Sequence, residues 1–146
     1  MNIEQITGTT IPSVVPLFDA YRQFYNQPGN TEAAQRFLEE RISKNESVIF
    51  MAKINGDPAG FVQLYPTFSS IALQRAYVLN DLYVDERFRK QGVGRSLLDK
   101  CYAYSIDRNA RFITLETAKD NHQAQKLYEQ MGMQQDEMLH YSKYWG

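Results

Sequence analysis

The sequence has almost no cysteine, since Cys101 is the only one among 146 residues. A single cysteine excludes an internal disulfide, and a chain without disulfides is typical of a reducing compartment. Cys101 falls within a helical pattern of apolar residues, so we expect it in the core and not at a reaction centre. The sequence therefore predicts a cytoplasmic protein whose core holds together without covalent cross-links.

Long apolar runs and a strong charge of one sign are lacking too. No apolar run approaches the roughly 18 residues of a membrane-spanning helix, and residues 1–10 do not resemble the start of a secretory signal. The formal net charge of −1 argues against a nucleic-acid surface. No spacing of His, Cys and Asp suggests a metal site, and no Ser-His-Asp arrangement is visible. We therefore expect no metal, membrane or nucleic acid among the partners.

The sequence does contain enough apolar residues, 43%, for a globular protein. Its length predicts a single domain spanning residues 1–146. Apolar spacing and turn residues predict the order β-α-α-β-β-β-α-β-α-β, and hence an α+β fold with a mixed sheet and helices on both faces. We expect strands at residues 1–6, 48–54, 59–65, 75–84, 112–116 and 138–144, helices at 12–26, 32–44, 95–109 and 122–131, and a loop at 66–73.

A short basic segment with two glycines lies between an expected strand and an expected helix: Arg89-Lys90-Gln91-Gly92-Val93-Gly94-Arg95. The first N–H groups of a helix lack partners within it, and the helix dipole adds about half a positive charge there. Gly92 and Gly94 have no Cβ, so the main chain can approach a phosphate closely. Arg89 and Lys90 add positive charge. This order of strand, turn and helix predicts a pyrophosphate-binding site.

Three nucleotide-binding motifs compete for this segment. A Walker A loop requires a lysine after its last glycine, but Gly94 is followed by Arg95. A Rossmann fingerprint requires glycine or alanine at its sixth position, which Leu97 occupies. The third motif is Arg/Gln-x-x-Gly-x-Gly/Ala, the acetyl-coenzyme A signature of the GNAT superfamily of N-acetyltransferases. Arg89, Gly92 and Gly94 match it.

Over essentially its whole length the chain resembles this superfamily. Leu79–Val84 is similar to the family's cofactor strand, and the basic loop follows it as in the family. Leu115–Asn121 resembles the neighbouring strand with its asparagine, and Ala124-x-x-Leu127-Tyr128-Glu129-x-x-Gly132-Met133 resembles the helix that comes next. The resemblance implies direct transfer of an acetyl group from acetyl-CoA to a primary amine in a ternary complex. The amine is left open among small amines, polyamines, amino acids and lysine side chains.

The resemblance also implies how acetyl-CoA is held. In the family two cofactor strands splay apart and the pantetheine arm lies between them. We expect the main chain of Leu82, Tyr83 and Val84 to pair with the arm, and Asn121 to bond it near the thiol. The residues expected to hold the pyrophosphate are those of the loop, Arg89, Lys90, Gln91, Gly92, Val93, Gly94 and Arg95.

Tyr128 is the expected general acid. By the resemblance, its counterparts lie near the thioester sulfur, so Tyr128 is expected to contact the cofactor as well. The departing thiolate is stabilised by a proton, and a phenol with a pKa of about 10 can donate one at neutral pH.

The group that accepts the amine proton is left open among Asp81, Glu116 and a chain of waters. Similar polyamine acetyltransferases carry a glutamate where this chain has Asn80, and an asparagine side chain is no useful proton acceptor. Strand alternation would point Asp81 to the other face of the sheet, unless a β-bulge changes the parity. Glu116 lies on the neighbouring strand, and we expect the N–H of Leu82 to stabilise the oxyanion.

The amine itself is expected to bind in an aromatic, weakly charged pocket. By the resemblance, the N-terminal helices form this pocket, with Tyr25, Tyr65 and Asn80 as substrate-binding residues and cation–π contacts to the amine. The end of the first helix resembles the branch that acts on polyamines, amino acids or small peptides. Arg22 or Arg75 would instead select an amine that carries a carboxylate.

A second class of function stays open, namely a module that binds acetyl-CoA as a sensor without efficient turnover. Asn80 in place of a glutamate favours the sensor, whereas Tyr128 favours an enzyme. Similar proteins are often dimers, and the aromatic segment at residues 141–145 predicts a homodimer contact.

Overall fold

The computed structural model describes all residues from Met1 to Gly146. They form two compact units, Met1–Glu116 and Thr117–Gly146. The first unit contains β1 (Asn2–Gln5), α1 (Ile11–Phe24), α2 (Thr31–Ser43), β2 (Val48–Ile54), β3 (Asp57–Ser69), β4 (Gln74–Val84), the short 3-10 helix η1 (Glu86–Phe88), α3 (Val93–Asp107) and β5 (Ile113–Thr114). The second unit contains α4 (His122–Gln130). None of the helices is both long enough and apolar enough to span a bilayer.

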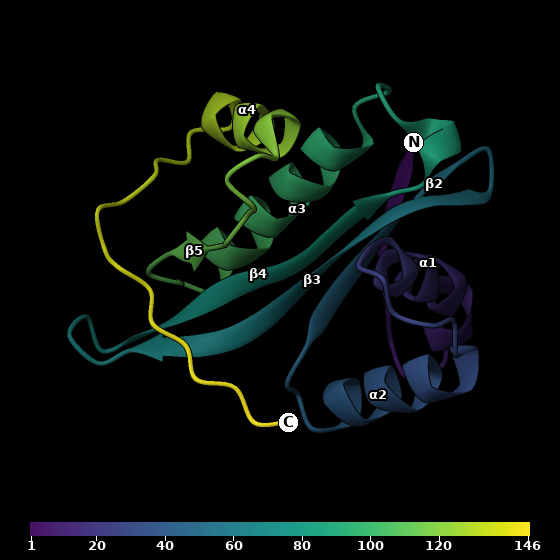
Figure 1. Cartoon of the computed structure of the whole chain (residues 1–146), viewed down its shortest axis with the longest axis horizontal. Helices are drawn as coiled ribbons and strands as arrows, with labels where there is room; N and C mark the ends of the chain where they lie inside the picture. Colours follow the sequence, from purple (N-terminus) through teal and green to yellow (C-terminus); the bar gives the residue numbers. More distant parts are fainter. The chain divides into compact units, whose positions relative to one another are not determined.

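The five strands lie in one mixed sheet in the order β1-β2-β3-β4-β5. Strands β1 to β4 are antiparallel neighbours, and β5 runs parallel to β4. Figure 1 shows α1 and α2 on one face of this sheet and α3 on the other. The predicted α+β fold, with a mixed sheet and helices on both faces, is confirmed.

Apolar side chains fill the space between the sheet and its helices. On one face Val14 of α1 and Leu38 of α2 are fully buried against the strands. Phe18 packs edge-on against Phe61 of β3, with ring centroids 6.0 Å apart. On the other face α3 buries Cys101, as the helical pattern predicted. Each such side chain contributes roughly 1.5–3 kcal/mol through burial.

Strand β3 extends to Ser69, so the loop expected at residues 66–73 is confined to residues 70–73, and the prediction was wrong for residues 66–69. Pro66 lies opposite Tyr77 on β4, and the N–H of Tyr77 donates to the carbonyl of Phe112 on its other side, at 3.0 Å. Antiparallel pairs alternate between those that exchange hydrogen bonds and those that do not. The Pro66–Tyr77 pair belongs to the second kind, so the missing N–H of proline costs the ladder nothing.

The strand expected at residues 138–144 is not formed, so that prediction was also wrong. Met138, Leu139 and Tyr141 are exposed and lie in no strand. An alternating sequence becomes a strand only where a neighbouring strand shares its main-chain hydrogen bonds. The predicted helix of this unit is present as α4, with Asn121 as its cap.

Candidate functional site

β5 accompanies β4 along only part of its length. The two strands pair at Tyr77 with Ile113 and at Val78 with Thr114. From Leu79 to Val84, β4 has β3 on one side and no strand on the other. We call this side the open edge of β4. It corresponds to the separation of two strands that the sequence led us to expect.

The main chain of Leu82 and Val84 points to the open edge. The N–H of Asp85 donates to the carbonyl of Ala59 on β3 at 2.8 Å. Because hydrogen-bonded and non-bonded pairs alternate in an antiparallel ladder, Tyr83 also bonds to β3. Leu82 and Val84 flank Tyr83, so their N–H and carbonyl groups face away from β3. An extended ligand could therefore pair with these two residues as a further strand would.

Arg89 is held against the end of β4. Its Nε donates to the carbonyl of Val84 at 3.0 Å. Its guanidinium carbon lies 5.9 Å from the centroid of the Tyr83 ring, within reach of a cation–π contact. Arg89 is nevertheless exposed. It therefore places a positive charge where β4 leads into the basic loop.

The basic loop leads into α3 through a left-handed turn. Gly92, the residue before α3, has a φ of +80°, and Lys90 also has a positive φ, of 64°. No side chain caps α3, and the N–H of Ser96 makes the first helical bond, to the Gly92 carbonyl at 3.0 Å. The N–H groups of Val93 and Gly94 thus precede the helical ladder, where the dipole concentrates positive charge.

This arrangement fits an anionic diphosphate. A Cβ built on Gly92 meets no atom within 4 Å, so the space in front of the loop is open to a ligand. Main-chain N–H groups at a helix start, together with basic side chains, are the donors that bind phosphate oxygens. The loop residues that the sequence singled out, from Arg89 to Arg95, lie together at this point of the fold.

A cleft of about 460 Å³ lies where α1, α2, β3 and β4 meet. Five of its eleven lining residues are aromatic, and the full lining consists of Phe18, Tyr21, Arg22, Tyr25, Gln27, Ala33, Ala34, Phe37, Tyr65, Asn80 and Asp81. We call it the aromatic cleft. It brings together Tyr25, Tyr65 and Asn80, which the sequence predicted as substrate residues. Asp81, one of the predicted bases, lines the same cleft.

A β-bulge at Asn80 turns Asp81 toward the aromatic cleft. The register pairs Leu64 with Leu79 and Gln63 with Asp81, which leaves Asn80 as an extra residue on β4. Regular alternation would place Asp81 on the same face as Leu79. The extra residue reverses this parity. From the sequence, Asp81 could face the substrate as a base only with such a bulge.

The carboxyl of Asp81 is buried among hydrogen-bond donors. Only 3% of the residue is exposed. The amide nitrogen of Gln63 donates to Oδ2, and that of Asn80 donates to Oδ1 at 2.9 Å. Burial raises the pKa of Asp81 above its ordinary value, and these hydrogen bonds offset only part of the rise. A raised pKa makes the carboxylate a better proton acceptor.

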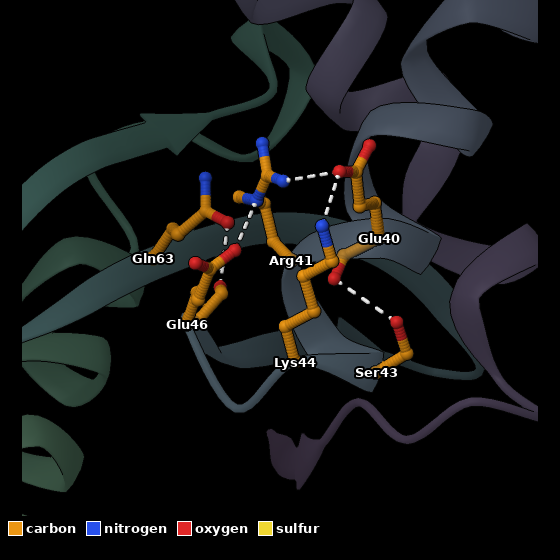
Figure 2. A network of polar contacts seen from close by, with 7 residues as sticks. Glu40, Arg41, Ser43, Lys44, Glu46 and Gln63 are labelled. Carbon is orange, nitrogen blue, oxygen red and sulfur yellow. Dashed lines mark hydrogen bonds and ion pairs between the residues drawn. The ribbon is translucent and has the colours of Figure 1, made fainter.

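Gln63 is itself held in a defined orientation. It is fully buried, and the hydroxyl of Ser47 donates to its Oε1 at 2.6 Å. Its amide nitrogen is therefore directed at Asp81. Figure 2 shows Gln63 in one view with the ion pair of Arg41 and Glu46, whose N–O distance is 2.9 Å.

Two phenols border Asp81. Burial, and then the charge of Asp81, raises the pKa of Tyr65 to about 12. The same causes, in the same order, raise the pKa of Tyr21. Both hydroxyls are therefore protonated and neutral near pH 7, and they act in the cleft as hydrogen-bond donors.

Sequence reasoning missed three residues of this region. The only signal for Gln63 is a polar residue within an otherwise apolar stretch of β3. Tyr21 and Phe37 matched the apolar face of their helices, and nothing in their spacing distinguishes a cleft wall from core. Only the packing of α1 and α2 against β3 and β4 reveals Tyr21 and Phe37 as lining.

The remaining predicted residues are Glu116 of the first unit and Asn121 and Tyr128 of the second. Glu116 follows β5, is exposed and does not line the cleft. In the second unit, Asn121 caps α4 by accepting the N–H of Ala124 at 3.2 Å, and Tyr128 lies on that helix. Their catalytic and cofactor roles stay predictions. No group of three or more His, Cys, Asp or Glu residues is placed to hold a metal ion.

Comparison with known proteins gives consistent matches. Residues 14–133 match the model of the Acetyltransferase (GNAT) family. The uncharacterized N-acetyltransferase YhfO of Bacillus subtilis (strain 168) is 42% identical, over 97% of this chain and 95% of that protein. The D-amino-acid N-acetyltransferase HPA3 of Saccharomyces cerevisiae is 29% identical, over 75% of this chain and 68% of that protein. A crystal structure of a probable acetyltransferase matches with a TM-score of 0.94 and 38% identity, over 100% of this chain and 99% of that chain.

Proposed function

The chain belongs to the acetyltransferase (GNAT) family, and we propose that it moves the acetyl group of acetyl-CoA to a primary amine bound in the aromatic cleft. One observation carries this proposal. Asp81 lines the cleft and directly precedes Leu82, whose main chain faces the open edge of β4. An amine beside Asp81 and an acetyl group beside Leu82 would meet at the same point of the strand.

The open edge and the basic loop would hold acetyl-CoA. The N–H groups of Val93 and Gly94 would bind its diphosphate at the start of α3. Leu82 and Val84 would pair with the pantetheine arm through their main chain. The main chain of Tyr83 bonds to β3, so Tyr83 would contribute through its ring, which contacts the guanidinium of Arg89. When bound, acetyl-CoA supplies the acetyl group as a thioester.

Asp81 would accept the proton that the amine must lose. A primary amine is mostly protonated at neutral pH and cannot attack in that form. The buried carboxylate of Asp81, with its raised pKa, would first hold the ammonium group and then take its proton. The N–H of Leu82 would stabilise the negative charge that develops on the acetyl oxygen.

Tyr128 would supply the proton at the other end of the reaction. The C–N bond forms as the C–S bond breaks, and the sulfur leaves as a thiolate. We assign Tyr128 as the donor to that thiolate because α4 carries the Ala-x-x-Leu-Tyr pattern typical of the family. The nitrogen loses its second proton to solvent as the amide forms, and the phenolate of Tyr128 regains a proton from solvent.

Release of the CoA thiol, followed with DTNB over a panel of primary amines, tests this function. Cys101 is buried, and burial raises the pKa of its thiol to about 12, so the folded protein should give little background. We expect thiol release that depends on the amine, and an acetylated amine in equal amount by mass spectrometry. Tight acetyl-CoA binding without such release from any amine would contradict the enzyme and support a sensor.

A further inference from the structure

The aromatic cleft contains very little charge that could hold a second polar group on the substrate. Arg22 is the only basic residue that lines it, and Asp81 is the only acidic one. The phenols are neutral, as their raised pKa values show for Tyr21 and Tyr65. The selectivity of the cleft therefore depends on whether Arg22 is available to a ligand.

The charge of Arg22 is already matched by Asp19. Its Nη1 lies 3.2 Å from Oδ1 of Asp19 and 3.3 Å from the carbonyl of Pro28. Asp19 is only 5% exposed, and it also accepts the N–H of Asn30 at 3.0 Å and the amide of Gln23 at 3.1 Å. This is a buried, fully bonded carboxylate. Withdrawing Arg22 to bind a ligand would leave Asp19 buried without its cation, which is costly.

The other arginines near this face are matched as well or point elsewhere. Arg41 of α2 lies between two carboxylates, 3.0 Å from Glu40 and 2.9 Å from Glu46 (Figure 2). Arg75 contacts the hydroxyl of Tyr77 at 3.5 Å, and the pairing parity places both on the α3 face of the sheet, opposite the aromatic cleft. Arg22 is thus the one arginine that lines the cleft, and Asp19 already matches its charge.

We propose that the acceptor is a small primary amine with one positive charge on an aromatic or other apolar body, and with no carboxylate. This inference rests on the proposed function and specifies its substrate class. Asp81 pairs with the single ammonium group, and the aromatic walls cover the apolar body and stabilise the cation through their ring faces. A carboxylate would lose its hydration, would meet only the arginine whose charge Asp19 already matches, and would be repelled by Asp81. A second ammonium group would be buried without a counter-ion.

A matched series of amines tests the inference on the wild-type protein. Phenethylamine, phenylalanine and phenylalaninamide share one body and differ at one substituent, and spermidine carries additional positive charges. With acetyl-CoA held constant, we expect kcat/KM for phenethylamine to exceed that for phenylalanine and for spermidine by roughly 10-fold or more. Phenylalaninamide should stay close to phenethylamine, because the amide adds bulk without charge. Equal or better use of phenylalanine or spermidine would overturn the inference.

Binding measured beside turnover separates this inference from the proposed function. The thermal shift that each amine causes is recorded in the presence of CoA. If no amine releases thiol but phenethylamine still stabilises the protein more than phenylalanine, the function fails and the cleft selectivity stands. If phenethylamine causes no shift, or phenylalanine causes the larger one, the selectivity fails whatever the turnover.

A pair of variants tests the charge argument directly. Asp19→Asn removes the ion-pair partner of Arg22, which lines the cleft. Glu46→Gln is the matched control, because it removes an ion-pair partner of Arg41, which does not line the cleft. We expect Asp19→Asn to raise the phenylalanine to phenethylamine ratio of kcat/KM by roughly 10-fold, and Glu46→Gln to leave it unchanged. An unchanged ratio in a folded Asp19→Asn protein would show that the Arg22 charge does not govern selectivity.

Discussion

At Asp81 two physical effects act on one carboxyl in opposite directions. Burial disfavours its charge, and the hydrogen bonds from Gln63 and Asn80 favour it. Ser47 orients Gln63, so the side chain that faces Asp81 is a donor and not an acceptor. The result is a carboxylate that is kept in place yet binds a proton more readily than an exposed aspartate does.

The first prediction distinguishes the two acidic candidates for the base. Asp81→Asn keeps the shape of the side chain but removes the proton acceptor, so we expect kcat/KM to fall by about 100-fold or more. Glu116→Gln is the matched control and should keep most of the activity. Thiol release at several amine concentrations measures both. Loss of activity in the Glu116 variant alone would move the base to Glu116.

The pH profile of the same proteins tests in which direction activity changes with pH. The base must be ionised, so wild-type kcat/KM should fall as the pH drops through the pKa of Asp81. Because burial raises that pKa, the fall should occur at a higher pH than for an ordinary aspartate. Glu116→Gln should keep this limb of the profile, and Asp81→Asn should lose it. An identical limb in Asp81→Asn would assign it to the amine or to another group.

A substitution at Tyr128 tests the proposed general acid. Tyr128→Phe removes the proton that the departing thiolate needs but retains the ring. We expect kcat to fall by roughly 10- to 100-fold and the acetyl-CoA dissociation constant to change little. Stopped-flow turnover and calorimetric titration measure the two separately. A variant as fast as the wild type would remove the general-acid assignment.

Among the elements, the turn into α3 depends on a glycine with positive φ. Gly92 has a φ of +80° and Gly56, in the β2–β3 turn, has +84°, and a Cβ on either meets no atom within 4 Å. Alanine should therefore cost both variants a similar stability, roughly 1–2 kcal/mol. Only Gly92 faces the space proposed for the diphosphate, since Gly56 lies in the turn between β2 and β3.

We predict that Gly92→Ala lowers acetyl-CoA affinity by roughly 10-fold, or about 1.4 kcal/mol, because its methyl group enters the space proposed for the diphosphate. Gly56→Ala should bind as the wild type does. Isothermal titration of both variants, with their unfolding midpoints, makes the comparison. Equal affinities would show that the diphosphate does not lie against Gly92.

Hydrogen exchange along β4 tests whether its edge is open to a ligand. Without cofactor, the amides of Leu82 and Val84 should exchange with solvent roughly 10-fold faster than that of Tyr83, because only Tyr83 bonds to β3. Acetyl-CoA should slow the exchange of Leu82 and Val84 and leave Tyr83 unchanged. Residue-resolved hydrogen exchange by NMR measures this. Equal protection of all three amides in the free protein would contradict the open edge.

For the whole molecule, a ligand that binds only the folded state raises the unfolding temperature. At a concentration of acetyl-CoA 100 times its dissociation constant, the expected gain is about 2.7 kcal/mol, or roughly 5–10 °C for a chain of this size. CoA without the acetyl group should give a similar shift, because the diphosphate contacts are shared. Gly92→Glu should lose the shift, since its charge repels the diphosphate. A full shift in that variant would place the nucleotide elsewhere.

The basic loop and its neighbours could be predicted from the sequence because their properties are local. Glycines at Gly92 and Gly94, basic residues beside them, and a β-forming run followed by a helical one suffice to predict strand, turn and helix. The same local patterns predicted most helices and strands of the mixed sheet. They failed at residues 66–69 and 138–144, where pairing with another strand, or the lack of it, overrides local preference.

Only the tertiary structure decided what faces the aromatic cleft. The side on which Asp81 lies depends on its register with Gln63, which is distant in the chain, and on the bulge at Asn80. The availability of Arg22 depends on how Asp19 is buried by the loop that reaches Asn30. Parity and charge matching arise from contacts between separate segments, so a linear pattern can name the candidate residues but not their environment.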